Sequence, residues 1–320
     1  MLHDTFLVAL PVAFLVAGAL VVALLAFGQA YIQFDAAVFP VQRQRYQGVA
    51  LAFDLADQAI RMILDAHVNV GMVGAIENIG LAKRLLTDAK NKFVQMGFAD
   101  QAVETICQER RVGIARDICD WAEGNRADAV IISTRGRSKL AAFFLGETAN
   151  KVLEYSRTCP VWLVKGTVKE KHAILAIDNS KNALRAVDHA GFMLTGTDVK
   201  VAVFHSKRDL KRFLPKEVAD EFPELQKFWQ RKAGKVILPF IQKAKDMLLE
   251  SGLREDQITT KLVDGSRSAA ADILEEIKTS KAGSLFMGLR GYSNVGDFAM
   301  GSVTRKVLNH AENMAVCVVP

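Results

Sequence analysis

The sequence predicts an α/β protein of two tandem domains, each built on a mainly parallel five-stranded sheet, with an apolar helix before them. Apolar strand-like runs alternate with helical patterns, which is typical of parallel sheets covered by helices. The second half also repeats the first. With 320 residues, 50% of them hydrophobic, the chain is long enough for two domains of about 150 residues each. We place a membrane anchor at 1–28, a degenerate domain at 29–167 and a complete domain at 168–320.

The repeat is an internal duplication with a constant offset. Gly146 matches Gly301, which sets the offset at 301 − 146 = 155 residues. The same offset matches 151–153 (Lys-Val-Leu) with 306–308, and the apolar run 161–164 with 316–319. It holds without a gap from Ala89 to the last strand. A period of this length with whole elements in register indicates a tandem duplication.

The chain opens on an apolar segment, Phe6–Phe27, that contains no charged residue. As a helix it would span about 33 Å, enough to cross a hydrocarbon core of roughly 30 Å. Arg43 and Arg45 follow it, which favours a cytoplasmic location for the rest of the chain. The alternative is a degenerate first strand and helix, because the offset puts the counterpart of Asp178 at Ala23. Residues 47–53 would then form the second strand.

The elements after this segment follow from periodicity and turn signals. In the first half we expect helices at 80–96 and 113–123, and strands at 102–106, 129–133 and 161–164. In the second half we expect strands at 173–177, 199–204, 258–263, 284–287 and 315–319. Helices are expected there at 181–194, 233–251, 268–278 and 303–309.

A glycine-rich loop follows the strand Ser284–Met287. Gly288, Gly291 and Gly301 are spaced by two and nine residues, and Ser302 then opens a helix. Glycine lets backbone N–H groups approach a ligand closely, and the free N–H groups at a helix start favour an anion. Strand, loop and helix together predict a phosphate-binding cradle.

These residues resemble the nucleotide-binding loop of the ATP-binding universal stress proteins, whose pattern is G-x2-G-x9-G-S/T. The run AILAIDNS, 173–180, matches as well, being a strand that ends in the family's Asp-x-Ser. The match covers 171–320. The resemblance implies an adenine-nucleotide α-hydrolase-like fold that binds ATP with Mg²⁺, with ligands at the carboxyl ends of the strands. AMP or another nucleotide remains open.

The resemblance assigns Asp178 to the ribose and phosphates, where an oxygen could hold Mg²⁺. The alternative role for Asp178 is the N-cap of the helix 181–194. Ser180 is the better cap.

The remaining site residues also come from the resemblance. Backbone amides of Gly288 and Gly291 would meet the α and β phosphates, and Gly301, Ser302 and Val303 would receive the distal ones. Arg290 would add a charge contact, and its alternative is a solvent-exposed arginine. Ala202 and Val203 would meet the adenine through backbone groups and apolar contact, and Met287 completes the expected site. Strand core is the alternative role for Ala202 and Val203.

The first half carries an altered loop. Gly136 and Gly146 remain, but Ser133 replaces the first glycine and Glu147 stands where the second half has Ser302. A carboxylate there would repel phosphates. We therefore predict that the first half does not bind ATP in this mode. It would instead pair its sheet edge with the second half, as the resembling family does in dimers, and a homodimer remains open.

Composition restricts the other function classes. The net charge is +6, but acidic and basic residues alternate in the densest run, 206–235, so we expect no nucleic-acid partner. The four cysteines and six histidines show no metal-ligand spacing, and no catalytic motif appears.

We therefore expect a regulator that binds ATP and acts on a protein partner, with at most slow hydrolysis. It would be tethered to the cytoplasmic face of a membrane or be free in the cytoplasm. Two alternatives are an adenylating enzyme of the related α-hydrolase group and an interaction module without nucleotide.

Overall fold

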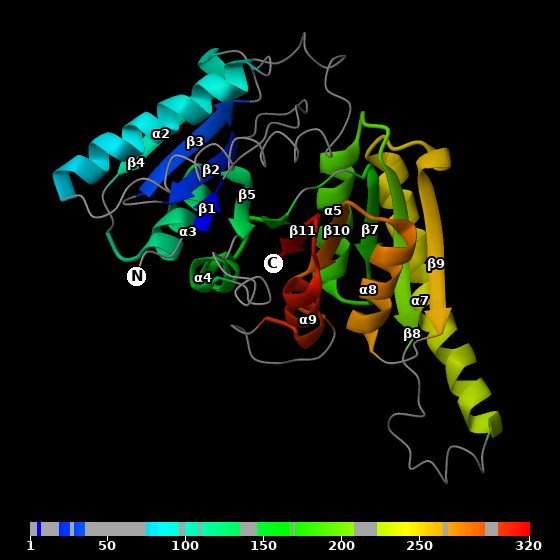
Figure 1. Cartoon of the computed structure of the whole chain (residues 1–320). Helices are drawn as coiled ribbons and strands as arrows, with labels where there is room; N and C mark the ends of the chain where they lie inside the picture. The colour runs from blue at the N-terminus through cyan, green and yellow to red at the C-terminus, as the bar shows by residue number, and fades with distance from the viewer. Residues whose placement is uncertain are drawn as a thin grey trace.

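A computed structural model describes residues 5–7, 19–25, 29–35, 75–95, 100–108, 111–134, 146–166, 168, 170–207, 223–264, 268–291 and 300–320. Its strands join one eleven-stranded sheet in the order β4-β3-β2-β1-β5-β6-β11-β10-β7-β8-β9. Helices cover both faces, and the two halves lie side by side along the sheet (Figure 1). The predicted α/β architecture is confirmed.

The second half contains the predicted five-stranded parallel sheet. Its strands are β7 (His172–Ala176), β8 (Lys200–Lys207), β9 (Ile258–Asp264), β10 (Ser284–Gly288) and β11 (Met314–Val319). All neighbouring pairs among them are parallel. The helices are α5 (Lys181–Leu194), α7 (Pro223–Glu250), α8 (Ala269–Ser280) and α9 (Ser302–His310), with a short 3-10 turn at Glu255–Gln257.

The first half is a mixed sheet rather than a mainly parallel one. Its strands are β1 (Thr5–Leu7), β2 (Ala19–Leu25), β3 (Gln29–Asp35), β4 (Val103–Gln108), β5 (Ala127–Thr134) and β6 (Val161–Lys165). Its helices are α2 (Ala75–Gln95), α3 (Ile114–Gly124) and α4 (Glu147–Tyr155), with a 3-10 turn at Asp100–Ala102. Strands β2, β5 and β6 are parallel, but β3 is antiparallel to both neighbours. Only residues 26–28 join β2 to β3, and so short a connection allows a hairpin but no crossover helix.

The predicted transmembrane helix over Phe6–Phe27 is wrong for the described part of that segment. Residues 5–7 and 19–25 are strands, and β2 runs parallel to β5 as β7 runs parallel to β10. An uncharged apolar run also suits a strand buried inside a sheet, so hydropathy alone does not separate the two. The alternative of a degenerate first strand is confirmed for β2, whereas residues 47–53 lie outside the described residues. Among the helices that the structure describes, none is long and apolar enough to cross a membrane.

Two hydrophobic clusters lie on opposite faces of the sheet. One contains buried residues of α2, α5 and α7, and the other contains those of α3, α4, α8 and α9. On β6, Trp162 and Val164 belong to the first cluster while Val161 and Leu163 belong to the second. This alternation follows from the two-residue period of a strand, and it shows that the strand is covered on both faces.

The halves are joined by the antiparallel pair β6–β11, with Trp162 opposite Cys317. Trp162 is fully buried, and its ring meets that of Phe286 edge-on with centroids 4.9 Å apart. Its indole nitrogen Nε1 donates to Nε2 of His189 on α5, 3.3 Å away. The predicted pairing of the two sheet edges within one chain is therefore confirmed.

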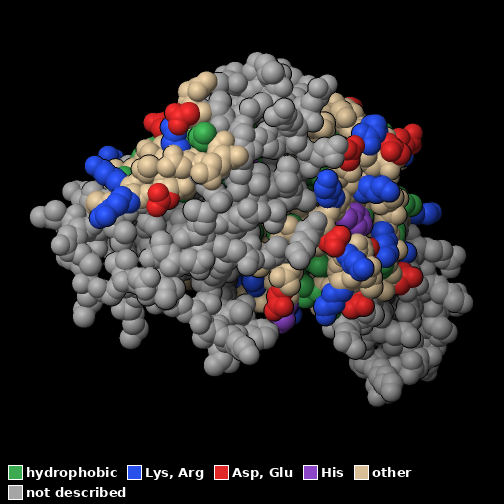
Figure 2. Space-filling model, turned by 45° about the horizontal axis from the view of Figure 1, so that its top comes forward, with side chains coloured by type: hydrophobic (Ala, Val, Ile, Leu, Met, Phe, Trp, Pro, Cys, Tyr) green, Lys and Arg blue, Asp and Glu red, His purple; other side chains and the backbone are tan. Residues whose placement is uncertain are grey.

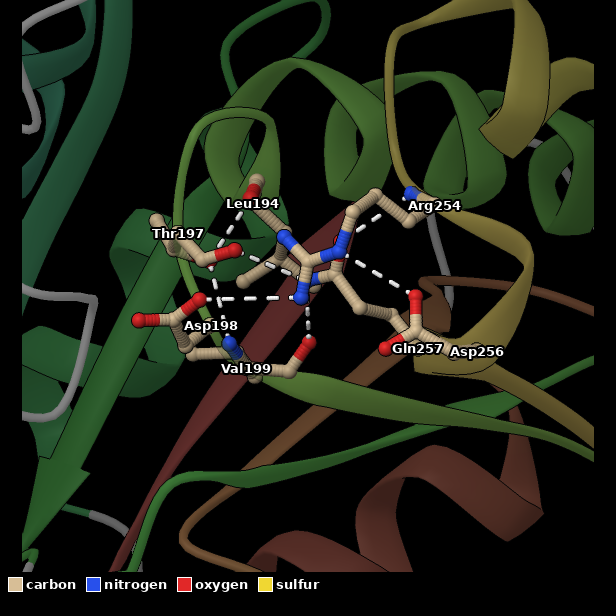
Figure 3. Close-up of polar contacts among 7 residues, drawn as sticks. All are labelled: Leu194, Thr197, Asp198, Val199, Arg254, Asp256 and Gln257. Carbon is tan, nitrogen blue, oxygen red and sulfur yellow. Dashed lines mark hydrogen bonds and ion pairs between the residues drawn. The ribbon is translucent and has the colours of Figure 1, made fainter.

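A buried glutamine ties the second half together at the amino ends of β8 and β9. Gln257 Nε2 donates to the carbonyl oxygens of Thr197 and Val199, at 2.7 and 3.0 Å. Its Oε1 accepts from the Arg254 amide at 3.0 Å (Figure 3). This cluster lies at the opposite end of the strands from the glycine-rich loop.

The surface of the described residues carries mixed charge. Figure 2 shows acidic and basic side chains close together over the second half. Two of the ion pairs are Lys207 with Asp264 and Lys245 with Glu255, at 3.1 and 2.8 Å. Exposed pairs of this kind add little to stability.

Candidate functional site

The candidate site forms where the parallel neighbours β7 and β10 end. Asp178 follows β7 by two residues and Gly288 is the last residue of β10. A Cβ atom on Gly291 would lie 2.6 Å from Oδ2 of Asp178, so the half-buried carboxylate rests against the loop glycine. The structure thus brings together two residues that are more than a hundred positions apart in the sequence.

The Asp178 side chain is held by its own turn. Its Oδ1 accepts from the Ser180 amide at 3.0 Å, while Ser180 Oγ accepts from the Ala183 amide at 3.1 Å. The prediction that Ser180 is the N-cap of α5 is confirmed. Because Ser180 already caps the helix, Asp178 is not needed for that purpose.

The start of α9 is fastened to the end of β10. The Gly301 amide donates to the Leu289 carbonyl oxygen at 3.0 Å, and Thr304 Oγ1 donates to the Gly288 carbonyl oxygen at 3.1 Å. A Cβ on Gly288 would lie 2.9 Å from Cβ of Asn182, so no larger residue fits there without a shift. Residues 292–299 of the loop lie outside the described residues.

The first turn of α9 offers the groups that an anion needs. Ser302 is its first residue and is exposed, Val303 is half-buried, and Gly301 precedes them as N-cap. The amides of a first helical turn have no partner within the helix, and the positive end of the helix dipole lies there. Arg290, which is half-buried, and the exposed Gly291 complete this side of the site. A carboxylate beside the amides of a helix start also suits Mg²⁺, which takes one or two carboxylates together with phosphate oxygens.

Three predicted residues lie in the core instead of at the loop. Val203 is fully buried, and Ala202 and Met287 are 5% and 4% exposed. Ala202 and Val203 pair with Ile174 and Leu175 in the middle of the sheet, because β8 continues to Lys207 and does not end at Phe204. Their alternative role as strand core is thus what the described structure shows.

The residues at the end of β8 were missed by the sequence reasoning. His205 Nδ1 lies 2.8 Å from the carbonyl oxygen of Ile177, the residue before Asp178. Ser206 Oγ donates to Asp272 Oδ2 at 2.5 Å. The strand predicted at 199–204 ends too early. With its carboxyl end placed correctly, the rule that ligands in such sheets bind beyond the strand ends would have identified these residues.

The first half has the same helix cap with a different first residue. The N-cap Gly146 has φ −58 and ψ 149, and Gly301 has φ −59 and ψ 145. Glu147 begins α4 with an exposed carboxylate, and Lys151 Nζ lies 2.5 Å from its Oε1. The equivalent helix start in the first half therefore carries a carboxylate, paired with Lys151, where the second half has a serine. Gly136 lies outside the described residues.

The first half also lacks the carboxylate that follows the first strand. Strand pairing identifies the equivalent positions in the two halves. Val22 pairs with Ile131, and Leu175 pairs with Phe286. Phe286 is the counterpart of Ile131, because 286 − 131 = 155, so Val22 is the counterpart of Leu175. Asp178 lies three residues beyond Leu175, so its structural counterpart is Leu25.

Strand β1 occupies the place where a ligand would lie in the first half. Thr5 pairs with both Leu25 and Thr134, at the carboxyl ends of β2 and β5. The corresponding position in the second half is bordered by Asp178 and Gly288. The backbone of β1 thus closes this end of the first half.

Comparison with known proteins agrees with this organisation. The model of the universal stress protein family matches residues 65–165 and 170–320, which is most of the chain and includes both halves. The protein therefore belongs to the universal stress protein family. No curated protein matches the chain.

Several solved structures are similar to this chain. A universal stress protein from Archaeoglobus fulgidus DSM 4304 is 22% identical, with 78% of this chain and 80% of that chain covered and a TM-score of 0.48. The universal stress protein UspA from Lactobacillus plantarum is 17% identical over 47% of this chain and 97% of its own, with a TM-score of 0.35. A universal stress protein in complex with cAMP is 21% identical over 47% and 96%, with a TM-score of 0.35.

Proposed function

We propose that this protein is a regulator that binds ATP with Mg²⁺ in its second half and changes its interactions with a protein partner according to the bound nucleotide. The observation that supports the proposal is the contact between Asp178 and Gly291, beside the exposed helix start at Ser302. A carboxylate for the metal and the amides of a helix start for the phosphates are thereby within one small site.

Each group of the site has a distinct task in this proposal. The amides of Gly288, Gly291 and the first turn of α9 bind phosphate oxygens, because glycine leaves the backbone accessible. Asp178 supplies an oxygen ligand for Mg²⁺ and orients the phosphates. The magnesium ion would neutralise phosphate charge. We assign no catalytic step to these residues, so ATP is a bound signal with at most slow turnover.

The test uses the substitution that the protein already carries in its other half. Ser302→Glu copies Glu147 onto an equivalent glycine cap, so the helix start tolerates it. The new carboxylate would face the phosphates, and like-charge repulsion should weaken ATP binding by roughly tenfold or more. Calorimetry on the full chain with ATP and Mg²⁺ measures the loss, and circular dichroism checks the fold.

The matched control is Glu147→Ser, the reverse exchange in the first half. It should leave the affinity and the stoichiometry of one ATP per chain unchanged, because Leu25 replaces the carboxylate and β1 closes that end. Cyclic AMP, the ligand named for one similar structure, serves as the comparison nucleotide. No binding of ATP by the wild-type chain would refute the proposal and favour an interaction module. Stoichiometric release of pyrophosphate with an acceptor would favour an adenylating enzyme.

The predicted location, at the cytoplasmic face of a membrane or in the cytoplasm, has no support from the described helices and stays a prediction. Fractionation of cells into membrane and soluble material tests it.

A further inference from the structure

A lysine of the first half reaches the helix that begins the candidate site. Lys165 is the last residue of β6 and is only 6% exposed. Its Nζ donates to the Leu308 carbonyl oxygen at 3.0 Å and to that of Asn309 at 3.5 Å. Both carbonyls belong to the last turn of α9, where carbonyl oxygens have no partner within the helix. The first half thus caps the end of α9 that lies opposite the candidate site.

The contact is electrostatically favourable, and it depends on its geometry. A cation at a helix C-terminus meets the negative end of the dipole. Burial lowers the pKa of Lys165, with a smaller opposing effect from Glu312. A buried ammonium group is costly unless it is hydrogen-bonded, so the two carbonyls hold this side chain in one place.

Helix α9 is held at both ends by different halves of the chain. Its start is fastened to β10 of the second half through Gly301 and Thr304, as described above. Its end is fastened to β6 of the first half through Lys165. The helix has nine residues, a length of about 14 Å, and Val307 and Leu308 are fully buried. So short a packed helix moves as one body, and a displacement of its end also displaces the amides at its start.

We propose that Lys165 is a positioning residue for the nucleotide site, through which the first half sets the ATP affinity of the second. The inference rests on the proposed function, since it assumes that ATP binds at the start of α9. The first half would then contribute to nucleotide binding through Lys165, although it lacks a counterpart of the Asp178 carboxylate and its own helix α4 begins with a glutamate. By linkage, ATP bound at the start of α9 must strengthen the Lys165 contact as much as that contact strengthens ATP binding.

The first measurement is the dissociation constant of ATP with Mg²⁺ for the full chain and for Lys165→Met, by calorimetry. We expect roughly tenfold weaker binding in the variant, within the usual range for coupling between two sites. Lys306→Met is the matched control, because Lys306 is an exposed lysine on the same helix, and it should leave the affinity unchanged. Lys165→Gln keeps a donor without the charge and should give an intermediate affinity.

A second readout separates positioning from a purely structural role. Hydrogen exchange of the β6 amides, residues 161–165, should slow when ATP is added to the wild-type chain, and this protection should be lost in Lys165→Met. A folded Lys165→Met protein with the wild-type dissociation constant would overturn the inference. If it fails to fold, Lys165→Gln decides, and wild-type affinity there has the same meaning. Failure of the wild-type chain to bind ATP would refute the proposed function instead.

Discussion

Replacing Gln257 by leucine tests how the second half is held together away from the candidate site. Gln257 is 3% exposed and makes three hydrogen bonds to the backbone of Thr197, Val199 and Arg254. Leucine has a similar size but neither donates nor accepts. The substitution therefore leaves two carbonyl oxygens and one amide without their partner.

The structure sets the size of the effect. At about 1 kcal/mol for each of the three hydrogen bonds, the free energy of unfolding should fall by about 3 kcal/mol. With a urea dependence of about 3 kcal/mol per molar, the unfolding midpoint should fall by about 1 M. Urea titration followed by circular dichroism measures this shift. Gln242→Leu is the matched control, because Gln242 is exposed and its side chain donates to Asp246, which is exposed to solvent on the same helix. The unfolding midpoint of this variant should barely move.

The same variant also tests the separation between the two ends of the strands. Gln257 lies at their amino ends and the glycine-rich loop at their carboxyl ends, so the ATP dissociation constant of Gln257→Leu should change by less than about twofold. A loss of stability below about 1 kcal/mol would show that water satisfies the freed backbone groups. A large loss of ATP affinity would show that the two ends are coupled, contrary to our reasoning.

Three further predictions concern a loop glycine, a buried histidine and the buried thiols. Gly291→Ala places a Cβ 2.6 Å from Asp178 Oδ2 and should weaken ATP binding by at least about tenfold in calorimetry. Gly124→Ala, whose Cβ meets nothing within 4 Å, should not. Burial lowers the pKa of His189 to about 3 in the folded chain. In the unfolded chain this imidazole takes up a proton near pH 6.5, so the free energy of unfolding falls as the pH drops below 6.5. Between pH 7 and 5 this costs about 2 kcal/mol in urea unfolding, and His189→Gln, which still accepts from Trp162, should lose that part of the pH dependence. Three thiols are buried and have raised pKa values, so they should react with Ellman's reagent at least about tenfold more slowly in the folded chain than in urea. They are Cys119, whose pKa is about 12, Cys159 and Cys317.

Most elements of the second half could be predicted because their signals are local. Helix α5 begins and ends at the predicted residues, since Ser180 caps it with a side chain three residues from its partner. The glycine spacing likewise predicted a strand, a loop and a helix, and β10 and α9 lie where that pattern put them. Caps, turns and periodicity act over a few residues and therefore leave a mark in the sequence.

The error at the N-terminus came from a choice that no local signal decides. The apolar run that includes β2 is long enough for a membrane helix and also suits a buried strand. Pairing with β5, about a hundred residues away, makes β2 a strand, and that partner cannot be read from the segment itself. The short connection to β3 then replaces a parallel crossover by a hairpin.

The duplication, the glycine-rich loop, its altered copy and the acidic residue that follows the first strand of the second half could be read from the sequence alone. Three other features depend on the folded core: Asp178 meets Gly291, His205 lies beside the turn of Asp178 while Val203 is buried, and Lys165 caps α9 across the join between the halves. The first group depends on residue type and spacing within one segment. The second depends on strand register and helix packing, which bring distant residues together through the whole core.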